Sequence, residues 1–165
     1  MLSEYSLGRY GLLMRAAFLA WGTGVVAVAV ALSRFAWPES LCLVLAAVGP
    51  LGAAFVDTDP INTPRAEQST KSKVHAALGA LFILGFPVAA TVTGISTAGN
   101  PAVGPVLAWA SLAPWIGLAW FLGATFRYAR PDGRGTPDVR IGWPNRASMF
   151  VYLGWVALAA VTILH

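Results

Sequence analysis

Five apolar runs, each about 20 residues long, constrain the fold of this chain more than any other feature. They cover about residues 10–32, 39–56, 73–95, 106–128 and 147–164. A helix needs roughly 20 consecutive apolar residues to cross the hydrocarbon core of a bilayer. We therefore predict an all-α fold, a polytopic transmembrane helix bundle of five spans that forms one domain over residues 1–165.

The composition agrees with a membrane protein. Charged residues make up 11% of the 165 residues and hydrophobic residues 57%, whereas a soluble domain carries about 25% charged residues. The formal charge of +4 is explained by basic residues that collect on cytoplasmic loops, so we expect no nucleic-acid partner. Cys42 is the only cysteine, lies inside an apolar run and cannot form an internal disulfide.

The basic residues also predict the orientation. With five spans, one side of the membrane receives the N-terminus and the connectors after the second and fourth spans. That side holds every Lys and Arg of the chain except Arg34. Cytoplasmic loops carry the excess of Lys and Arg, so we expect a multi-pass protein of the cell membrane, surrounded by lipid, with a cytoplasmic N-terminus.

The polar stretch AAFVDTDPINTPRAEQSTKSKVHAALGA, residues 53–80, holds the residues best suited to chemistry. Asp57 and Asp59 are two of the seven acids, and His75 is the only histidine besides the last residue. Asp57 ends the second span and His75 begins the third, so antiparallel packing would bring them to the same depth. Arg146 begins the fifth span on the same side. We therefore expect Asp59 and His75 to lie close together, with Arg146 near enough to join them.

Three interpretations of this polar group stay open. Two carboxylates and an imidazole could bind a divalent cation, or act as a base and its orienting partner. Metal sites usually have three or four protein ligands, and no HxxxH, HExxH or CxxC motif occurs, so we assign no metal, cofactor or catalytic residue. In the structural alternative, Asp57 and Asp59 cap the connector and pair with Lys71, Lys73 or an arginine of the last connector.

Local signals predict details of the helices. Thr70 or Ser72 can cap the third span. Pro87 and Pro114 lie inside apolar runs and should kink their helices, because proline lacks the backbone N–H. Arg15 lies little more than one turn inside the first span, where its long side chain can reach the head groups.

The stretches YSLGRYGLLMRAAFLAWG, FVDTDP, KVHAALGALF and GWPNRASMFVYLGW together resemble a family of bacterial and archaeal integral membrane proteins, domain of unknown function 998 (DUF998). The resemblance covers nearly the whole chain and implies the family pattern at Phe55, Asp59, Pro60, His75, Gly142 and Arg146. Asn145 stands where glutamine is usual. Val56-Asp57 replaces what is commonly Pro-Thr, which makes Asp59 the better site candidate of the two acids. Members often begin with one more span, so we expect an abbreviated start or a first helix supplied by a partner.

Two classes of function follow. The first is a non-catalytic membrane protein, either a subunit of a larger membrane complex or a bundle that binds a small ligand or lipid. Short loops, the lack of a recognisable catalytic set and the small-residue stripe Ala16, Ala20 and Gly24 favour it. The alternative is a membrane enzyme that acts on a lipid or isoprenoid head group at the cytoplasmic interface through Asp59 and His75.

Overall fold

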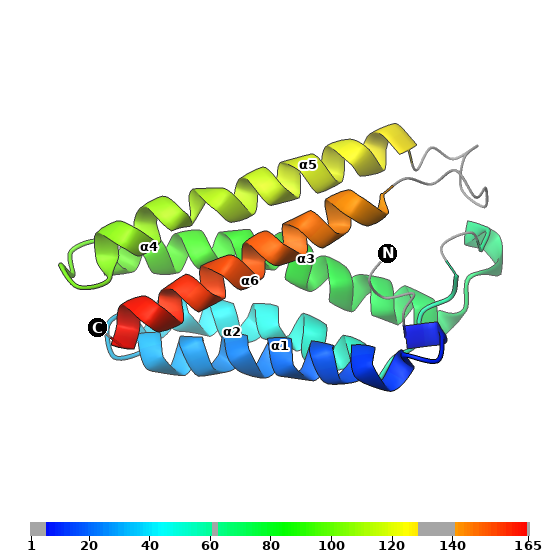
Figure 1. Cartoon of the computed structure of the whole chain (residues 1–165), viewed down its shortest axis with the longest axis horizontal. Helices are drawn as coiled ribbons and strands as arrows, with labels where there is room; N and C mark the ends of the chain where they lie inside the picture. Colours follow the sequence, from blue (N-terminus) through cyan, green and yellow to red (C-terminus); the bar gives the residue numbers. More distant parts are fainter. Residues whose placement is uncertain (1–5, 61–62, 129–140, 165) are drawn as a thin grey trace.

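The structure is a computed structural model that describes residues 6–60, 63–128 and 141–164. These residues form a bundle of helices without a strand, which confirms the predicted all-α bundle (Figure 1). The predicted connector with Arg130, Arg134 and Arg140 lies outside the described residues. The elements are α1 Gly11–Leu32, α2 Trp37–Ala53, the short 3-10 helix η2 Arg65–Glu67, α3 Thr70–Thr97, α4 Gly104–Ala110, α5 Leu112–Tyr128 and α6 Gly142–Leu164.

Four of the expected spans are long and apolar enough to cross a membrane: α1, α3, α6 and the segment Gly104–Tyr128, which contains α4 and α5. The chain is therefore a multi-pass membrane protein. The second run is shorter than expected, because α2 ends at Ala53 and has 17 residues. The fourth run is broken at Ser111, three residues before Pro114, where the helix lacks the N–H donor of that proline.

The helices form two groups that diverge towards one end of the bundle. In Figure 1, α1, α2 and α3 lie together, and α6 crosses in front of α3 from the α1–α2 turn at the left to the upper right, where its start runs beside α5. The connector between α2 and α3 and the start of α6 share the end where the two groups are farthest apart, on the right of the view. The α1–α2 and α3–α4 turns lie at the opposite end. The fold thus places the polar connector beside the widest part of the bundle.

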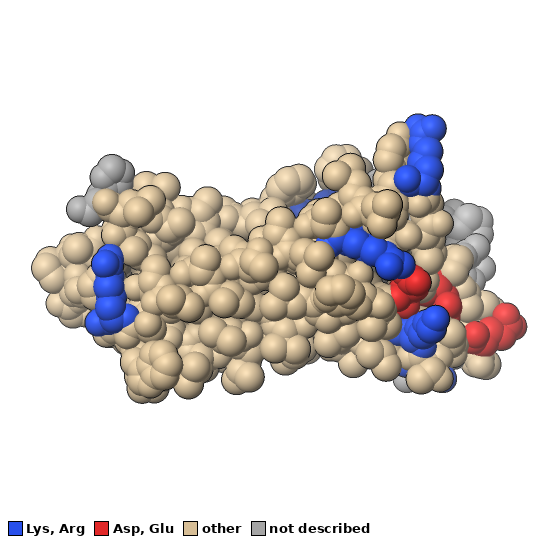
Figure 2. All heavy atoms as spheres, turned by 90° about the horizontal axis from the view of Figure 1, so that it is seen from below, with Lys and Arg blue, Asp and Glu red and all other residues tan. Residues whose placement is uncertain are grey.

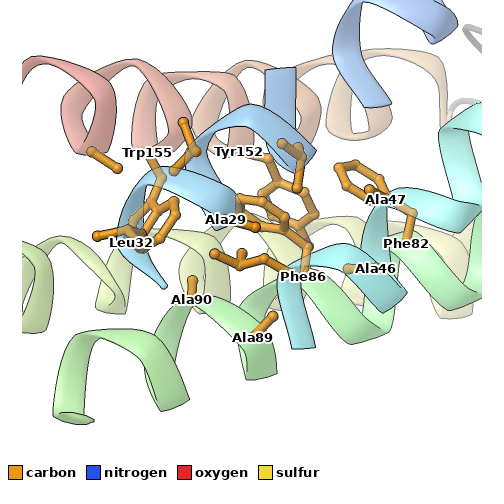
Figure 3. Packing of buried hydrophobic residues seen from close by; sticks show 14 of the residues in the cluster. Ala29, Leu32, Ala46, Ala47, Phe82, Phe86, Ala89, Ala90, Tyr152 and Trp155 are labelled. Atoms are coloured by element: carbon orange, nitrogen blue, oxygen red, sulfur yellow. The ribbon is translucent and has the colours of Figure 1, made fainter. Parts of the chain in front are cut away.

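Aromatic side chains join the two groups in the middle of the molecule (Figure 3). The rings of Phe86 on α3 and Tyr152 on α6 stack with their centroids 4.8 Å apart, and Trp155 meets Phe86 edge-on at 5.6 Å. The Tyr152 hydroxyl donates a hydrogen bond of 2.8 Å to the Ile83 carbonyl. Pro87 lies four residues after Ile83 and has no N–H for that carbonyl, so α6 supplies the donor that α3 lacks.

Glycines allow the closest contacts between helices. A Cβ on Gly49 of α2 would lie 2.5 Å from the Leu78 carbonyl oxygen of α3. A Cβ on Gly94 of α3 would lie 2.7 Å from the Ser111 hydroxyl. Close approach at small residues is how helices gain van der Waals contact in lipid, so these two positions fix the spacing of α3 from its neighbours.

The charged side chains gather at the two ends of the molecule and leave a broad uncharged middle, as Figure 2 shows for one face. Most lie at the end with the polar connector. At the other end the Arg34 guanidinium donates a hydrogen bond of 3.0 Å to the Ile163 carbonyl near the end of α6. The uncharged middle is the part of the surface suited to lipid.

Candidate functional site

Asp59 anchors the polar connector to the start of α3. Its two carboxylate oxygens accept hydrogen bonds from the Ser69 backbone N–H, at 2.7 Å, and from the Ser69 hydroxyl, at 3.0 Å. Ser69, rather than Thr70 or Ser72, is the N-cap, since its hydroxyl accepts from the Ser72 backbone N–H. A carboxylate is favourable beside the positive end of a helix dipole, so Asp59 stabilises both the connector and the helix start.

Asp57 binds a different element. Its carboxylate lies 2.6 Å from the Arg15 guanidinium of α1, in an ion pair whose two side chains are both partly exposed. Arg15 therefore has a protein partner at the end of the bundle, where the sequence suggested head groups alone. Among the described residues, neither Lys71 nor Lys73 forms the ion pair expected for this acid. The pair links α1 to the connector that follows α2.

His75 lies in the second turn of α3 and is 7% exposed. Its Nδ1 lies 2.6 Å from the Val56 carbonyl oxygen. A carbonyl can only accept, so Nδ1 must carry the hydrogen, and Nε2 of the neutral ring is an acceptor. No hydrogen bond to Nε2 is present within the described part of the chain. The Phe18 ring of α1 meets the imidazole edge-on at 6.2 Å.

A cavity of about 330 Å³ opens beside His75, between the two diverging groups of helices. Every long helix of the bundle contributes to its wall. Its polar lining comes from Thr58, His75 and Asn145, and among the described residues no Lys, Arg, Asp or Glu lines it. Its apolar walls include Phe18 and Trp21 of α1, Pro50 of α2, Phe82 of α3, Phe121 of α5 and Met149 of α6. The cavity is therefore apolar and uncharged, with polar groups at the end near the connector.

Only one of the four predicted site residues lines this cavity. Asp57, Asp59, His75 and Arg146 all lie at the same end of the bundle, but within the described residues no hydrogen bond or ion pair joins Asp59 to His75. Arg146 lies with its guanidinium carbon 5.5 Å from the centre of the Trp143 ring. A single site made of Asp59, His75 and Arg146 stays a prediction.

The sequence interpretation missed most of the cavity lining. Phe18 and Trp21 are three residues apart and so share one face of α1, but periodicity does not say what they face. The Trp21 Nε1 is buried and has no hydrogen-bond partner in the described structure. Its ring meets Phe82 edge-on at 5.0 Å. Asn145 could have been found from the stretch GWPNR, which the family resemblance already contained.

The possible metal ligands Asp57, Asp59 and His75 each contact another protein group. In the part of the chain that the structure describes, no three His, Cys, Asp or Glu side chains lie together as a possible ion site. The two acids are held by Ser69 and Arg15, and His75 is held by a backbone carbonyl. What the arrangement offers is one imidazole side chain in the wall of an apolar cavity.

Comparison with curated proteins and with solved structures gave no match. The family model described as "Protein of unknown function (DUF998)" matches residues 1–162. That match covers nearly the whole chain, including all the long helices and the polar connector. The chain therefore belongs to the DUF998 family.

Proposed function

We propose that this protein is a non-catalytic membrane bundle that binds one small amphiphilic molecule in the cavity between its two helix groups. The observation that carries the proposal is an uncharged cavity of about 330 Å³ with a buried imidazole in its wall. Ligand pockets have volumes of roughly 300–1,000 Å³, mainly apolar walls and a few polar groups. The cavity fits that description at the lower end of the volume range.

The lining on α3 supports entry from the lipid. Ala76, Ala80 and Leu84 line the cavity and also have exposed side chains. At 1.5 Å per residue they cover about 12 Å along the helix axis, on a helix that is long and apolar enough to cross the membrane. Two of the three are alanines, which leave space between neighbouring helices. A molecule dissolved in the bilayer could pass between them.

The charges favour a cavity in the cytoplasmic half of the cell membrane. In the described chain, the end with the polar connector carries Arg9, Arg15, Lys71, Lys73, Arg127 and Arg146, whereas the opposite end carries Arg34. Cytoplasmic ends carry the excess of basic residues. This supports a cytoplasmic N-terminus, and with that orientation the cavity mouth would lie in the inner leaflet.

The contacts of Asp59 favour binding over catalysis. An enzyme acting on a head group through Asp59 and His75 needs both side chains at one reacting atom. Both carboxylate oxygens of Asp59 are instead hydrogen bonded to Ser69. Within the described residues, His75 lines the cavity without a carboxylate partner, which suits ligand recognition better than proton transfer.

A role as a subunit of a larger membrane complex is a second candidate. The small residues Ala16 and Ala20 are exposed on the outer face of α1, and a Cβ on Gly24 would meet no atom within 4 Å. Small residues allow a second helix to approach closely in lipid. Gly24→Leu should release a partner that survives gentle detergent extraction, and Gly24→Ala should retain it. Extraction of the wild type without any partner would contradict this role.

A tryptophan placed in the cavity mouth tests the main proposal. Ala80→Trp introduces a large side chain at the lining of α3, and Ala77→Trp is the matched control, because Ala77 is exposed on the same helix but does not line the cavity. We expect native mass spectrometry from nanodiscs to show a bound small amphiphile in the wild type and in Ala77→Trp but not in Ala80→Trp. Equal occupancy in all three proteins would overturn the proposal.

A further inference from the structure

We infer that His75 selects a neutral ligand with a hydroxyl group, a single-chain lipid alcohol or a phenol, and rejects phosphorylated lipids. This inference rests on the proposed binding function and specifies the chemistry of the head group. Three properties of the site carry it: the hydrogen-bond state of His75, the charge of the cavity wall and the size of the cavity.

The hydrogen bonding of His75 favours a ligand that carries a hydrogen-bond donor. Nδ1 donates to the Val56 carbonyl, which leaves Nε2 of the neutral ring as an acceptor. The side chain is 7% exposed and lines the cavity, so an unpaired Nε2 would lose its contact with water when a ligand fills the space. A buried polar atom without a partner is costly. A ligand O–H supplies the missing hydrogen, whereas an ether, ester or ketone oxygen cannot.

The charge of the wall excludes an anionic head group. Within the described residues, no Lys or Arg lines the cavity. Arg15, which lies at the same end of the bundle, is engaged by Asp57 at 2.6 Å. A phosphate moved into an apolar space without a cation carries a large desolvation cost. A hydroxyl is uncharged and costs far less to bury when it is hydrogen bonded, and the polar side chains of Thr58 and Asn145 line the same space.

The size of the cavity limits the apolar part of the ligand. A volume of about 330 Å³ lies near the bottom of the range for ligand pockets, which fits one chain or one ring rather than two acyl chains. Phe18, Trp21, Phe82 and Phe121 offer aromatic surface to either shape. A long-chain or isoprenoid alcohol and an alkyl phenol both combine a hydroxyl donor with one apolar part, and the test distinguishes these two classes of ligand.

The test compares probes that differ at a single group. Farnesol, farnesyl methyl ether, farnesyl phosphate and 4-nonylphenol are titrated against the protein in nanodiscs. The ether keeps the oxygen acceptor of farnesol and loses the donor. We expect farnesol to bind about tenfold more tightly than the ether, and the phosphate to bind more weakly than either. Tighter binding of nonylphenol than of farnesol would indicate that the natural ligand is a phenol. Tighter binding of farnesol would indicate that it is a long-chain alcohol.

The variant His75→Asn separates recognition from support of the fold. The asparagine amide can still donate to the Val56 carbonyl from the position of Nδ1, but it places no acceptor at the position of Nε2. We expect His75→Asn to keep the melting temperature within a few degrees of the wild type and to bind farnesol and its ether equally.

The possible failures are distinguishable. Equal binding of farnesol and its ether to the wild type, or preferred binding of the phosphate, overturns the hydroxyl inference even if His75→Asn fails to fold. If the probes bind equally but Ala80→Trp abolishes binding, the cavity proposal survives without the hydroxyl inference. If no probe binds and Ala80→Trp changes nothing, both proposals fail.

Discussion

At the scale of single residues, the two acids of the polar connector serve different helices. Asp59 accepts two hydrogen bonds from Ser69 at the start of α3. Removing a capping interaction costs about 0.5–2 kcal/mol. We expect Asp59→Ala to lower the melting temperature in detergent by several degrees, and Asp59→Asn, which keeps one acceptor oxygen, to lower it less. An unchanged melting temperature in Asp59→Ala would show that these hydrogen bonds do not hold the connector.

The ion pair between Arg15 and Asp57 should contribute little. The two side chains are 40% and 46% exposed, and pairs of this exposure contribute about 0–1 kcal/mol because water screens them. A double-mutant cycle with Arg15→Gln and Asp57→Asn measures the coupling directly. We expect less than about 1 kcal/mol, and a coupling several times larger would mean that lipid shields the pair from water.

Some residues of the site could be predicted from the sequence and others could not. Asp57, Asp59 and His75 stood out because polar residues are rare in this chain. Their partners could not be predicted in this way. Ser69 comes close to Asp59, and the Val56 carbonyl to His75, only because of how the connector folds. The cavity is lined by aromatic and small residues of five helices. In the sequence, such residues cannot be distinguished from residues that simply pack in the core of the bundle.

At the scale of helices, α2 and α3 are in contact at Gly49. A Cβ there would lie 2.5 Å from a backbone oxygen and 2.7 Å from the Cβ of Phe82, so Gly49→Ala must push the helices apart. Overpacking of this kind costs about 1–3 kcal/mol. We expect a clear fall in melting temperature, whereas Gly24→Ala, with no atom within 4 Å, should cause none. Equal melting temperatures for the two variants would contradict the described packing.

The hydrogen bond between α6 and α3 can be tested through Pro87, which leaves the Ile83 carbonyl without a donor inside α3. Tyr152→Phe removes the donor to the Ile83 carbonyl, and hydrogen bonds between membrane helices contribute roughly 0.6 kcal/mol on average and up to about 1.7. The loss should be smaller in a Pro87→Ala background, because the alanine N–H can satisfy that carbonyl within α3. Melting temperatures of the two single variants and the double variant give the coupling. An equal effect of Tyr152→Phe in both backgrounds would refute this explanation.

Helix bounds were mostly predictable because apolar runs mark them. The sequence placed the first span at residues 10–32, and α1 is Gly11–Leu32. The third helix is longer than the predicted 73–95, because Ser69 and Asp59 start it at Thr70. Pro114 predicted a kink in the fourth run, and the helix is broken three residues before that proline, at Ser111. The position of the break could not be predicted, because hydropathy does not reveal the hydrogen bond from the Ser111 hydroxyl to the Ala90 carbonyl of α3.

At the scale of the whole molecule, the orientation can be tested by cysteine labelling. In a Cys42→Ala background, Glu67→Cys lies in η2 beside the basic end, and Asn100→Cys lies in the turn between α3 and α4. The excess of Lys and Arg near Glu67 predicts that this end stays in the cytoplasm. A membrane-impermeant maleimide should label only the second cysteine in intact cells. Labelling of position 67 alone would reverse the orientation.

The cavity beside His75 should hold an amphiphile from the membrane. An experimental structure of the full chain in nanodiscs made from native lipids would show whether it does. We expect an elongated density between α3, α5 and α6 that ends within hydrogen-bonding distance of His75 Nε2. A cavity closed by the surrounding side chains, or filled by water alone, would contradict it.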